Sequence, residues 1–224
     1  TYTVTYTTAG SCPNSSGDVV TINAAPTVTF TAPTDLCLDA GNQTNQTGGS
    51  PIGGLYSGPG VTDTGDGINY SFDPAAAGVG THTITYNFTD GNGCSGSAND
   101  NVVVFAVPTV NFAALADLCL DAGIQTGLTG GSPTGGVYSG PGVTDVGDGI
   151  NYSFDPAVAG AGTHTITYIF TDGNGCDGGA NDNVVVFGLD NASFSYSAAG
   201  YCLGDSDPTP TITGLGGGTF TVLP

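Results

Sequence analysis

An internal repeat constrains this chain more than any other feature. Residues 26–107 recur as residues 108–189 at an offset of 82 residues, and 65 of the 82 aligned positions are identical. About 80 residues are enough for one small β-sandwich with its own hydrophobic core. We therefore expect each of these repeats to be a separate domain.

Partial repeats flank the central pair. The same offset carries Cys12 onto Cys94, so residues 1–25 are predicted to be the C-terminal part of a preceding repeat. Residues 190–224 are predicted to begin a following one, with Cys202 near its start. The chain opens inside an alternating pattern, which indicates a segment of a longer repeat array.

The composition favours β-structure. The chain has no Lys, Arg, Glu, Met or Trp, and all 19 acidic residues are Asp. Lys, Arg, Glu and Met are good helix formers, whereas Asp is a poor one. Thr, Val, Tyr and Phe suit strands, and Gly, Pro, Asn and Asp suit turns. Long helices are therefore not expected.

Within a repeat the hydrophobic period is two. In residues 81–89, His, Ile, Tyr and Phe alternate with Thr, which predicts a half-buried strand. A turn at residues 90–93 and a strand at 101–105 should complete a hairpin. Residues 27–30 and 69–72 are predicted to be short strands, and residues 73–78 one helical turn capped by Asp73. The predicted fold class is all-β, with tandem immunoglobulin-like β-sandwich domains in an elongated array.

The charge excludes several functions. The formal net charge is −19, with no Lys or Arg to offset it. A basic nucleic-acid groove, a P-loop lysine and an arginine clamp are impossible in this segment, and anionic lipid is a poor partner. The segment contains no apolar run long enough to insert into a membrane. The expected partners are neighbouring repeats of the same chain and other copies packed laterally.

Four motifs carry a resemblance to a known family. They are residues 54–63, 70–74, 80–86 and 90–94. Together they resemble the immunoglobulin-like and PKD-like tandem repeats of very long cell-surface proteins from Bacteroidota-type bacteria, many of them adhesin-like and exported by type 9 secretion. The resemblance implies an extracellular, cell-surface location and a structural role as a stalk or fibre.

Six cysteines in such a repeat protein indicate disulfides and an oxidising compartment. We expect the pairs Cys37–Cys94 and Cys119–Cys176 within the repeats, with Cys12 and Cys202 bonded outside the segment or across junctions. This pairing has a difficulty, because an ordinary sandwich would place its two cysteines at opposite ends. The rival scheme staples each junction through the pairs Cys12–Cys37, Cys94–Cys119 and Cys176–Cys202.

Calcium is the candidate cofactor. Asp and Asn residues recur in Gly-rich loops and offer the hard oxygen ligands that calcium prefers. The alternative is that these side chains bond to their own backbone and so shape the turns. The candidate ligands are Asp63, Asp66, Asp90, Asn92, Asp145, Asp148, Asp172 and Asn174.

Catalysis is not expected. The paired Asp residues lack an apolar pocket that would raise one pKa, and the Ser residues lie in Gly-rich loops without a triad. His82 and His164 are predicted to be half-buried and bonded to the backbone. We therefore expect a non-catalytic segment of an adhesin-like extracellular tether. The alternatives are a self-assembling extracellular filament subunit and a calcium-dependent glycan- or cell-binding module.

Overall fold

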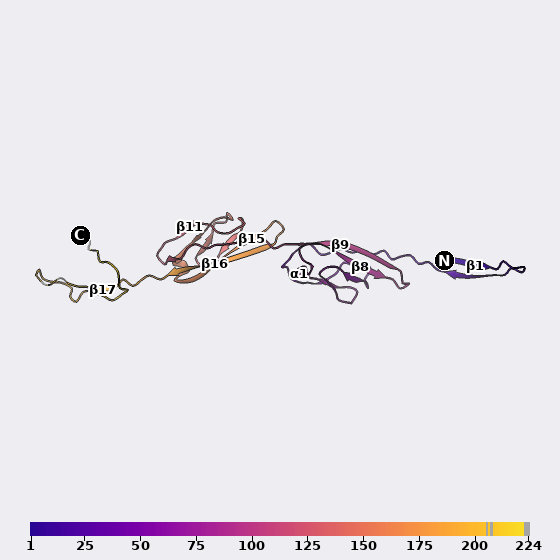
Figure 1. The fold of residues 1–224 in the computed structure, drawn as a ribbon, viewed down its shortest axis with the longest axis horizontal. Coiled ribbons are helices and arrows are strands. Elements are labelled where there is room, and N and C mark those ends of the chain that lie inside the picture. The colour runs from indigo at the N-terminus through magenta and orange to yellow at the C-terminus, as the bar shows by residue number, and fades with distance from the viewer. Residues whose placement is uncertain (205, 207, 222–224) are drawn as a thin grey trace. The chain divides into compact units, whose positions relative to one another are not determined.

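The computed structural model describes residues 1–204, 206 and 208–221 (Figure 1). The chain divides into two compact units. The first comprises Thr1–Val107 with Gly173–Cys176, and the second comprises Pro108–Asp172 with the chain from Asp177 onward. The two helices have four residues each, so the described chain is almost entirely β-structure and turns. None of the helices in the described chain has the length and apolarity needed to cross a membrane.

The first unit contains a complete β-sandwich. One sheet has the strand order β3-β9-β8-β5 and the other β4-β7-β6. These orders match the A′GFC and BED sheets of an immunoglobulin constant-type domain. The elements are β3 (Leu36–Cys37), β4 (Gln43–Gln46), β5 (Leu55–Ser57), β6 (Val61–Asp63), β7 (Tyr70–Phe72), α1 (Pro74–Ala77), β8 (Gly80–Thr89) and β9 (Ser95–Phe105).

The second unit repeats this sandwich, with strand orders β10-β16-β15-β12 and β11-β14-β13. The sequence prediction of an all-β, immunoglobulin-like fold is thus confirmed by the strand topology of both units. The elements are β10 (Leu118–Cys119), β11 (Gln125–Leu128), β12 (Val137–Ser139), β13 (Val143–Asp145), β14 (Tyr152–Phe154), α2 (Pro156–Ala159), β15 (Gly162–Thr171) and β16 (Asp177–Phe187).

Shorter elements flank the sandwiches. A hairpin of β1 (Tyr2–Thr7) and β2 (Ser15–Val20) lies at the N-terminus, and its apolar side chains are exposed. Near the C-terminus, β17 (Phe194–Ser195) pairs with β18 (Thr211–Ile212).

Alternation in the long strands builds the core. Ile84 and Tyr86 on β8 are fully buried, whereas the Thr residues of the same strand are exposed or half-buried. Tyr70 and Phe72 enter from the opposite sheet, and the rings of Tyr56 and Tyr70 stack with centroids 4.4 Å apart. The same side chains recur 82 residues later in the second core. Each repeat therefore buries its own aromatic core between its own two sheets.

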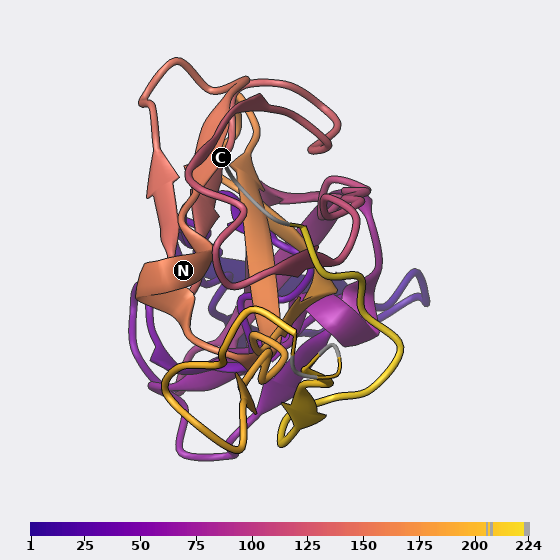
Figure 2. The same cartoon turned by 90° about the vertical axis from the view of Figure 1, so that its left-hand side faces the viewer.

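Two local predictions are confirmed. Asp73 caps α1 through its side chain, which accepts hydrogen bonds from the backbone N–H groups of Ala75 and Ala76, and Pro74 begins the helix. The single turns α1 and α2 are visible as short coils in Figure 2. The β8–β9 hairpin is also present, but β9 begins at Ser95 rather than at residue 101.

The predicted strand at residues 27–30 is largely absent. Only Thr29 forms a β-bridge, with Ser50 in the loop after β4, and the chain joins a sheet later, as β3 beside β9. The reason is that this first segment divides its pairing between that loop and β9. Each contact is therefore too short to form the regular strand that alternation alone predicts.

Candidate functional sites: the cysteines and the aspartate loops

Cys37 lies at the end of the sandwich from which the chain leaves the first repeat. Strand β3 pairs in parallel with β9, and Cys37 stands opposite Phe105, the last residue of β9. From Phe105 the chain runs through Ala106 and Val107 into the second repeat. Cys119 holds the same place in the second repeat, opposite Phe187 at the end of β16.

Cys94 lies at the other end, where the chain enters the repeat. It follows the turn between β8 and β9, and its Sγ is 3.9 Å from the carbonyl oxygen of Asn23. Asp90 shapes this turn, because its Oδ1 accepts hydrogen bonds of 2.9 Å from the backbone N–H groups of Asn92 and Cys94. The hairpin turn thus presents its cysteine at the entry end of the sandwich.

Cys37 and Cys176 form a disulfide, with their Cα atoms 5.6 Å apart. The expected pairs Cys37–Cys94 and Cys119–Cys176 are therefore wrong, and so are the rival pairs Cys12–Cys37 and Cys176–Cys202. The strand explains why. At about 3.3 Å per residue, the 11 residues of β9 hold Cys37 and Cys94 roughly 30 Å apart, whereas a disulfide needs Cα atoms within about 7 Å.

The other cysteines differ in their surroundings. Cys12 and Cys119 are free thiols with exposed side chains, and Cys94 is a free thiol that is half-buried. Cys176, by contrast, is fully buried. The side chain of Cys202, in the C-terminal segment, is also exposed.

Asp63 ties the loop after β6 to strand β5. Its Oδ2 accepts a 2.6 Å hydrogen bond from the backbone N–H of Tyr56, and its Oδ1 accepts one of 2.7 Å from Gly65. Asp145 makes the same two bonds, to Tyr138 and Gly147. Both oxygens of each carboxylate thus hold a loop against the edge strand.

Asp66 shapes the tip of that loop. Its Oδ1 accepts from the backbone N–H groups of Ile68 and Asn69, and its Oδ2 accepts from the Asn69 side chain. These hydrogen bonds hold the pKa of the Asp66 carboxyl well below its usual value. The bond from the backbone N–H of Asn69 has the largest effect, and the bond from the Asn69 side chain has the next largest. Asp148 repeats the arrangement, and its pKa is lowered first by the side chain of Asn151.

The eight candidate calcium ligands are distributed over separate loops. Asp63 and Asp66 share one loop of the first repeat, and Asp90 and Asn92 share the hairpin turn. Asp145 and Asp148 repeat the first arrangement, and Asp172 and Asn174 lie in the second hairpin turn. Within residues 1–204, 206 and 208–221, no three His, Cys or carboxylate side chains gather as a metal-binding group. Calcium therefore remains a prediction, while the turn-shaping hydrogen bonds are present.

His82 and His164 lie at the starts of their long strands, as predicted. The Nε2 of His82 is 2.7 Å from the carbonyl oxygen of Gly78, and that of His164 is 2.8 Å from the carbonyl oxygen of Gly160. Both rings are half-buried. Each histidine thus anchors the residue that follows a helical turn, and the prediction of a backbone-bonded histidine is confirmed.

Sequence reasoning missed a second set of structural Asp residues. Asp100 on β9 accepts a 3.0 Å bond from the backbone N–H of Ala32, which lowers the pKa of its carboxyl. Asp35 accepts a 2.9 Å bond from the backbone N–H of Val103. Both bonds connect the first segment to β9 across 68 residues, and they recur in the second repeat at Asp182 and Asp117. The available signal was that both residues are unchanged between the repeats.

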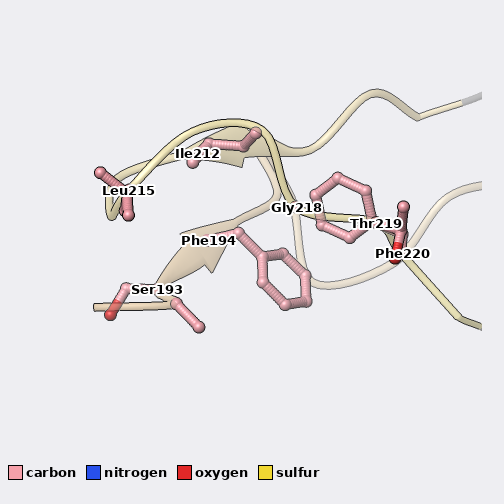
Figure 3. A pocket seen from close by; sticks show the side chains of 8 residues that line it. Ser193, Phe194, Ile212, Leu215, Gly218, Thr219 and Phe220 are labelled. Atoms are coloured by element: carbon pink, nitrogen blue, oxygen red, sulfur yellow. The ribbon is translucent and has the colours of Figure 1, made fainter. Parts of the chain in front are cut away.

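An open apolar pocket of about 220 Å³ lies in the C-terminal segment (Figure 3). Phe194 and Phe220 form one side, with ring centroids 5.1 Å apart in an edge-to-face arrangement. Ile212 and Leu215 also line it and are exposed. The pocket contains no charged side chain among its lining residues.

No protein-family model matches this chain, and no curated protein matches it. Among solved structures, one described as a Ca²⁺-stabilized adhesin that helps an Antarctic bacterium reach out and bind ice is 15% identical, with a TM-score of 0.40. The match covers 88% of this chain and 59% of that chain, so this chain spans less than two thirds of it.

Two further structures show the same level of similarity. The fibronectin(III)-like modules of CbhA from Clostridium thermocellum are 14% identical, with a TM-score of 0.33, covering 72% of this chain and 95% of theirs. The extracellular cadherin domains 1–5 of protocadherin gamma B2 are 13% identical, with a TM-score of 0.31, covering 96% of this chain and 52% of that one. All three contain β-sandwich modules, and a shared sandwich does not define a function.

Proposed function

We propose that this chain is a structural, non-catalytic segment of an extracellular cell-surface stalk or fibre, an adhesin-like tether. The observation that carries the proposal is the disulfide between Cys37 in the first repeat and Cys176 in the second. Disulfides persist in oxidising compartments outside the cytosol. A bond that joins consecutive repeats serves the connection between domains rather than the stability of one domain alone.

The covalent connectivity supports a mechanical role. The two repeats are joined once by the peptide linkage at Ala106 and Val107 and a second time by the disulfide. Two covalent connections restrict rotation between domains more than one linker does. Each repeat also buries a complete core of its own, so neither depends on the other for folding.

The surface chemistry suits a tether. A net charge of −19 without any Lys or Arg keeps like surfaces apart. The same composition leaves trypsin-like proteases without a cleavage site. The resemblance of the loop and strand motifs to Bacteroidota-type surface repeats is the ground for placing the tether on such a cell, with export by type 9 secretion.

Sedimentation velocity on the 224-residue chain tests the tether against its alternatives. The tether predicts a monomer with a high frictional ratio, unchanged by calcium and by protein concentration. Cys37→Ser should lower that ratio if the disulfide limits bending, with Cys94→Ser as the matched control. A mass that grows with concentration would support the filament alternative instead and overturn the proposal.

Location is tested separately. An antibody against residues 26–107, applied to intact and non-permeabilised cells of the source organism, should label their surface. Labelling only after permeabilisation would contradict the proposed extracellular position.

A further inference from the structure

Two free cysteines occupy the same structural positions as the two bonded ones. Cys119 stands opposite the last residue of β16, as Cys37 stands opposite the last residue of β9. Cys94 follows the turn between β8 and β9, as Cys176 follows the turn between β15 and β16. The chain therefore contains one completed pair and both halves of a second pair.

The bonded and free copies differ in exposure. Cys37 is half-buried, whereas its counterpart Cys119 is exposed. Cys176 is fully buried, whereas its counterpart Cys94 is only half-buried. Because the two repeats share their sequence around these positions, the difference follows the bond itself. Cys94 and Cys119 therefore occupy the two positions of an inter-repeat disulfide while remaining free thiols.

The surrounding elements are already in place for a second bond. Residues 90–94 and 172–176 have the same sequence, Asp-Gly-Asn-Gly-Cys. Residues 35–41 and 117–123 also share one sequence, Asp-Leu-Cys-Leu-Asp-Ala-Gly. In both repeats the strand after the cysteine-bearing turn runs beside the proline that begins the repeat, since a Cβ on Gly96 would touch the Pro26 carbonyl and one on Gly178 the Pro108 carbonyl.

This polarity explains the observed pair. Each repeat has a β3-type cysteine, Cys37 or Cys119, at the end where the chain leaves the repeat. Each also has a turn cysteine, Cys94 or Cys176, near the proline where the chain enters the repeat. Pro108 follows Phe105 by three residues, and Phe105 is the partner of Cys37. The turn cysteine of a directly following repeat therefore lies close to the β3-type cysteine of the repeat before it.

We propose that Cys119 forms a disulfide with the turn cysteine, the equivalent of Cys176, of a further repeat of this type. We propose likewise that Cys94 forms a disulfide with the β3-type cysteine, the equivalent of Cys37, of a further repeat. The partner is thus another copy of the repeat, joined in series by the bond that links Cys37 to Cys176. The inference goes beyond the proposed tether, because the cysteine pairing depends only on the structure of the repeats and not on the function of the protein that contains them.

Forming the bond requires a two-electron oxidant, for which a small-molecule disulfide such as oxidised glutathione suffices. The Cys119 thiolate attacks one sulfur of that disulfide and releases one glutathione thiolate. The turn cysteine, as its thiolate, then attacks the Cys119 sulfur and releases the second. Two protein thiols are oxidised to one disulfide, and one glutathione disulfide is reduced to two thiols.

An extended chain tests the pairing. A copy of residues 26–107 is inserted directly after Leu189, so that its proline follows Leu189 as Pro108 follows Val107. Cys94 of the original chain and the Cys37 equivalent of the insert are replaced by Ser. Each remaining cysteine then lies in a peptide of its own after cleavage at Phe and Tyr, with Cys37 in residues 31–56 and Cys119 in residues 113–138. A matched control also replaces the turn cysteine of the insert by Ser.

Both chains are equilibrated with reduced and oxidised glutathione, alkylated, and cut after Phe and Tyr with an aromatic-specific protease under non-reducing conditions. Mass spectrometry should find Cys119 linked to the turn cysteine of the insert. Because a tethered partner has an effective concentration near millimolar, alkylation of Cys119 should fall about tenfold or more relative to the control.

The result that overturns the proposal is equally direct. If Cys119 stays alkylated in both chains while Cys37 remains linked to Cys176, the inter-repeat disulfide is a property of the first junction alone, and the proposal is wrong. Linkage of Cys119 to any other cysteine would also overturn it. Retention of the Cys37–Cys176 peptide in both chains shows that the original repeats are folded.

Discussion

Cys37 and Cys176 are 139 residues apart in the sequence, yet their Cα atoms lie 5.6 Å apart and their sulfurs are bonded. Each has a counterpart in the other repeat that is not its partner. The bond therefore connects non-equivalent positions of two nearly identical repeats. This pairing is asymmetric, so it can continue along an array, whereas a bond between equivalent cysteines would join only two repeats.

The disulfide should contribute measurably to stability. Replacing Cys37 by Ser opens a long covalent loop, and removal of a native disulfide typically costs about 2–5 kcal/mol. We expect a lower melting temperature by calorimetry for Cys37→Ser, and a similar decrease for Cys176→Ser. Cys94→Ser, at the position equivalent to Cys176, should melt like the wild type. Equal melting temperatures for all three variants and the wild type would contradict this role.

Two buried tyrosines should respond differently to loss of their hydroxyl groups. The hydroxyl of Tyr86 donates to the carbonyl of Pro51 at 2.5 Å and accepts from the backbone N–H of Gly54 at 2.8 Å. Tyr86→Phe leaves that buried N–H without its acceptor, which costs about 1–3 kcal/mol. Chemical denaturation should show the loss as a lower midpoint.

Tyr70 provides the matched comparison. Its side chain is fully buried, and its hydroxyl has no hydrogen-bond partner among the described residues. Burial raises the pKa of Tyr70 to about 12. Tyr70→Phe removes an unpaired polar group, so stability should stay the same or increase. A larger loss for Tyr70→Phe than for Tyr86→Phe would refute this assignment of the two hydroxyls.

Acid should destabilise the repeats through four hydrogen-bonded carboxylates. Hydrogen bonds hold the pKa of Asp66, Asp100, Asp148 and Asp182 below the ordinary value of 3.8. A carboxyl with a lowered folded-state pKa contributes stability that is fully present above its unfolded pKa and is lost as the pH falls through its folded pKa. The melting temperature should therefore fall as the pH drops below about 4.

Two measurements check this pH dependence. A ¹³C NMR titration of the folded chain should place the Asp66 carboxyl midpoint below 3.8. Asp66→Asn keeps a side-chain oxygen for the loop N–H groups but removes the charge. Its melting temperature should be lower than that of the wild type at neutral pH, with the gap narrowing in acid. A midpoint at or above 3.8 would contradict the hydrogen-bonded arrangement.

The calcium hypothesis predicts a melting temperature that is higher in millimolar calcium than in EDTA. A ligand at 100 times its dissociation constant stabilises the folded state by about 2.7 kcal/mol. The shift should disappear in a variant with Asp63→Asn and Asp145→Asn. An identical melt in calcium and EDTA would overturn the hypothesis and leave the hydrogen bonds as the role of these Asp residues.

Much of the local structure follows from the sequence. Alternation in residues 81–89 predicts strand β8, with Ile84 and Tyr86 facing the core, because side chains in a strand alternate between its faces. Asp73 and Pro74 predict the start of α1, because a side-chain acceptor and a fixed φ both favour a helix N-terminus. The histidine contacts were predictable from the same strand pattern. These features depend on near neighbours in the chain.

The pairings were decided by the tertiary structure. Sequence alone indicated that disulfides should form, but the partner of Cys37 depends on the length of β9, which places Cys37 and Cys94 at opposite ends of the sheet. The same limit hid the bonds of Asp35 and Asp100, which span 68 residues. Local preferences act over a few residues, whereas these contacts arise only when two sheets have packed and brought distant segments together.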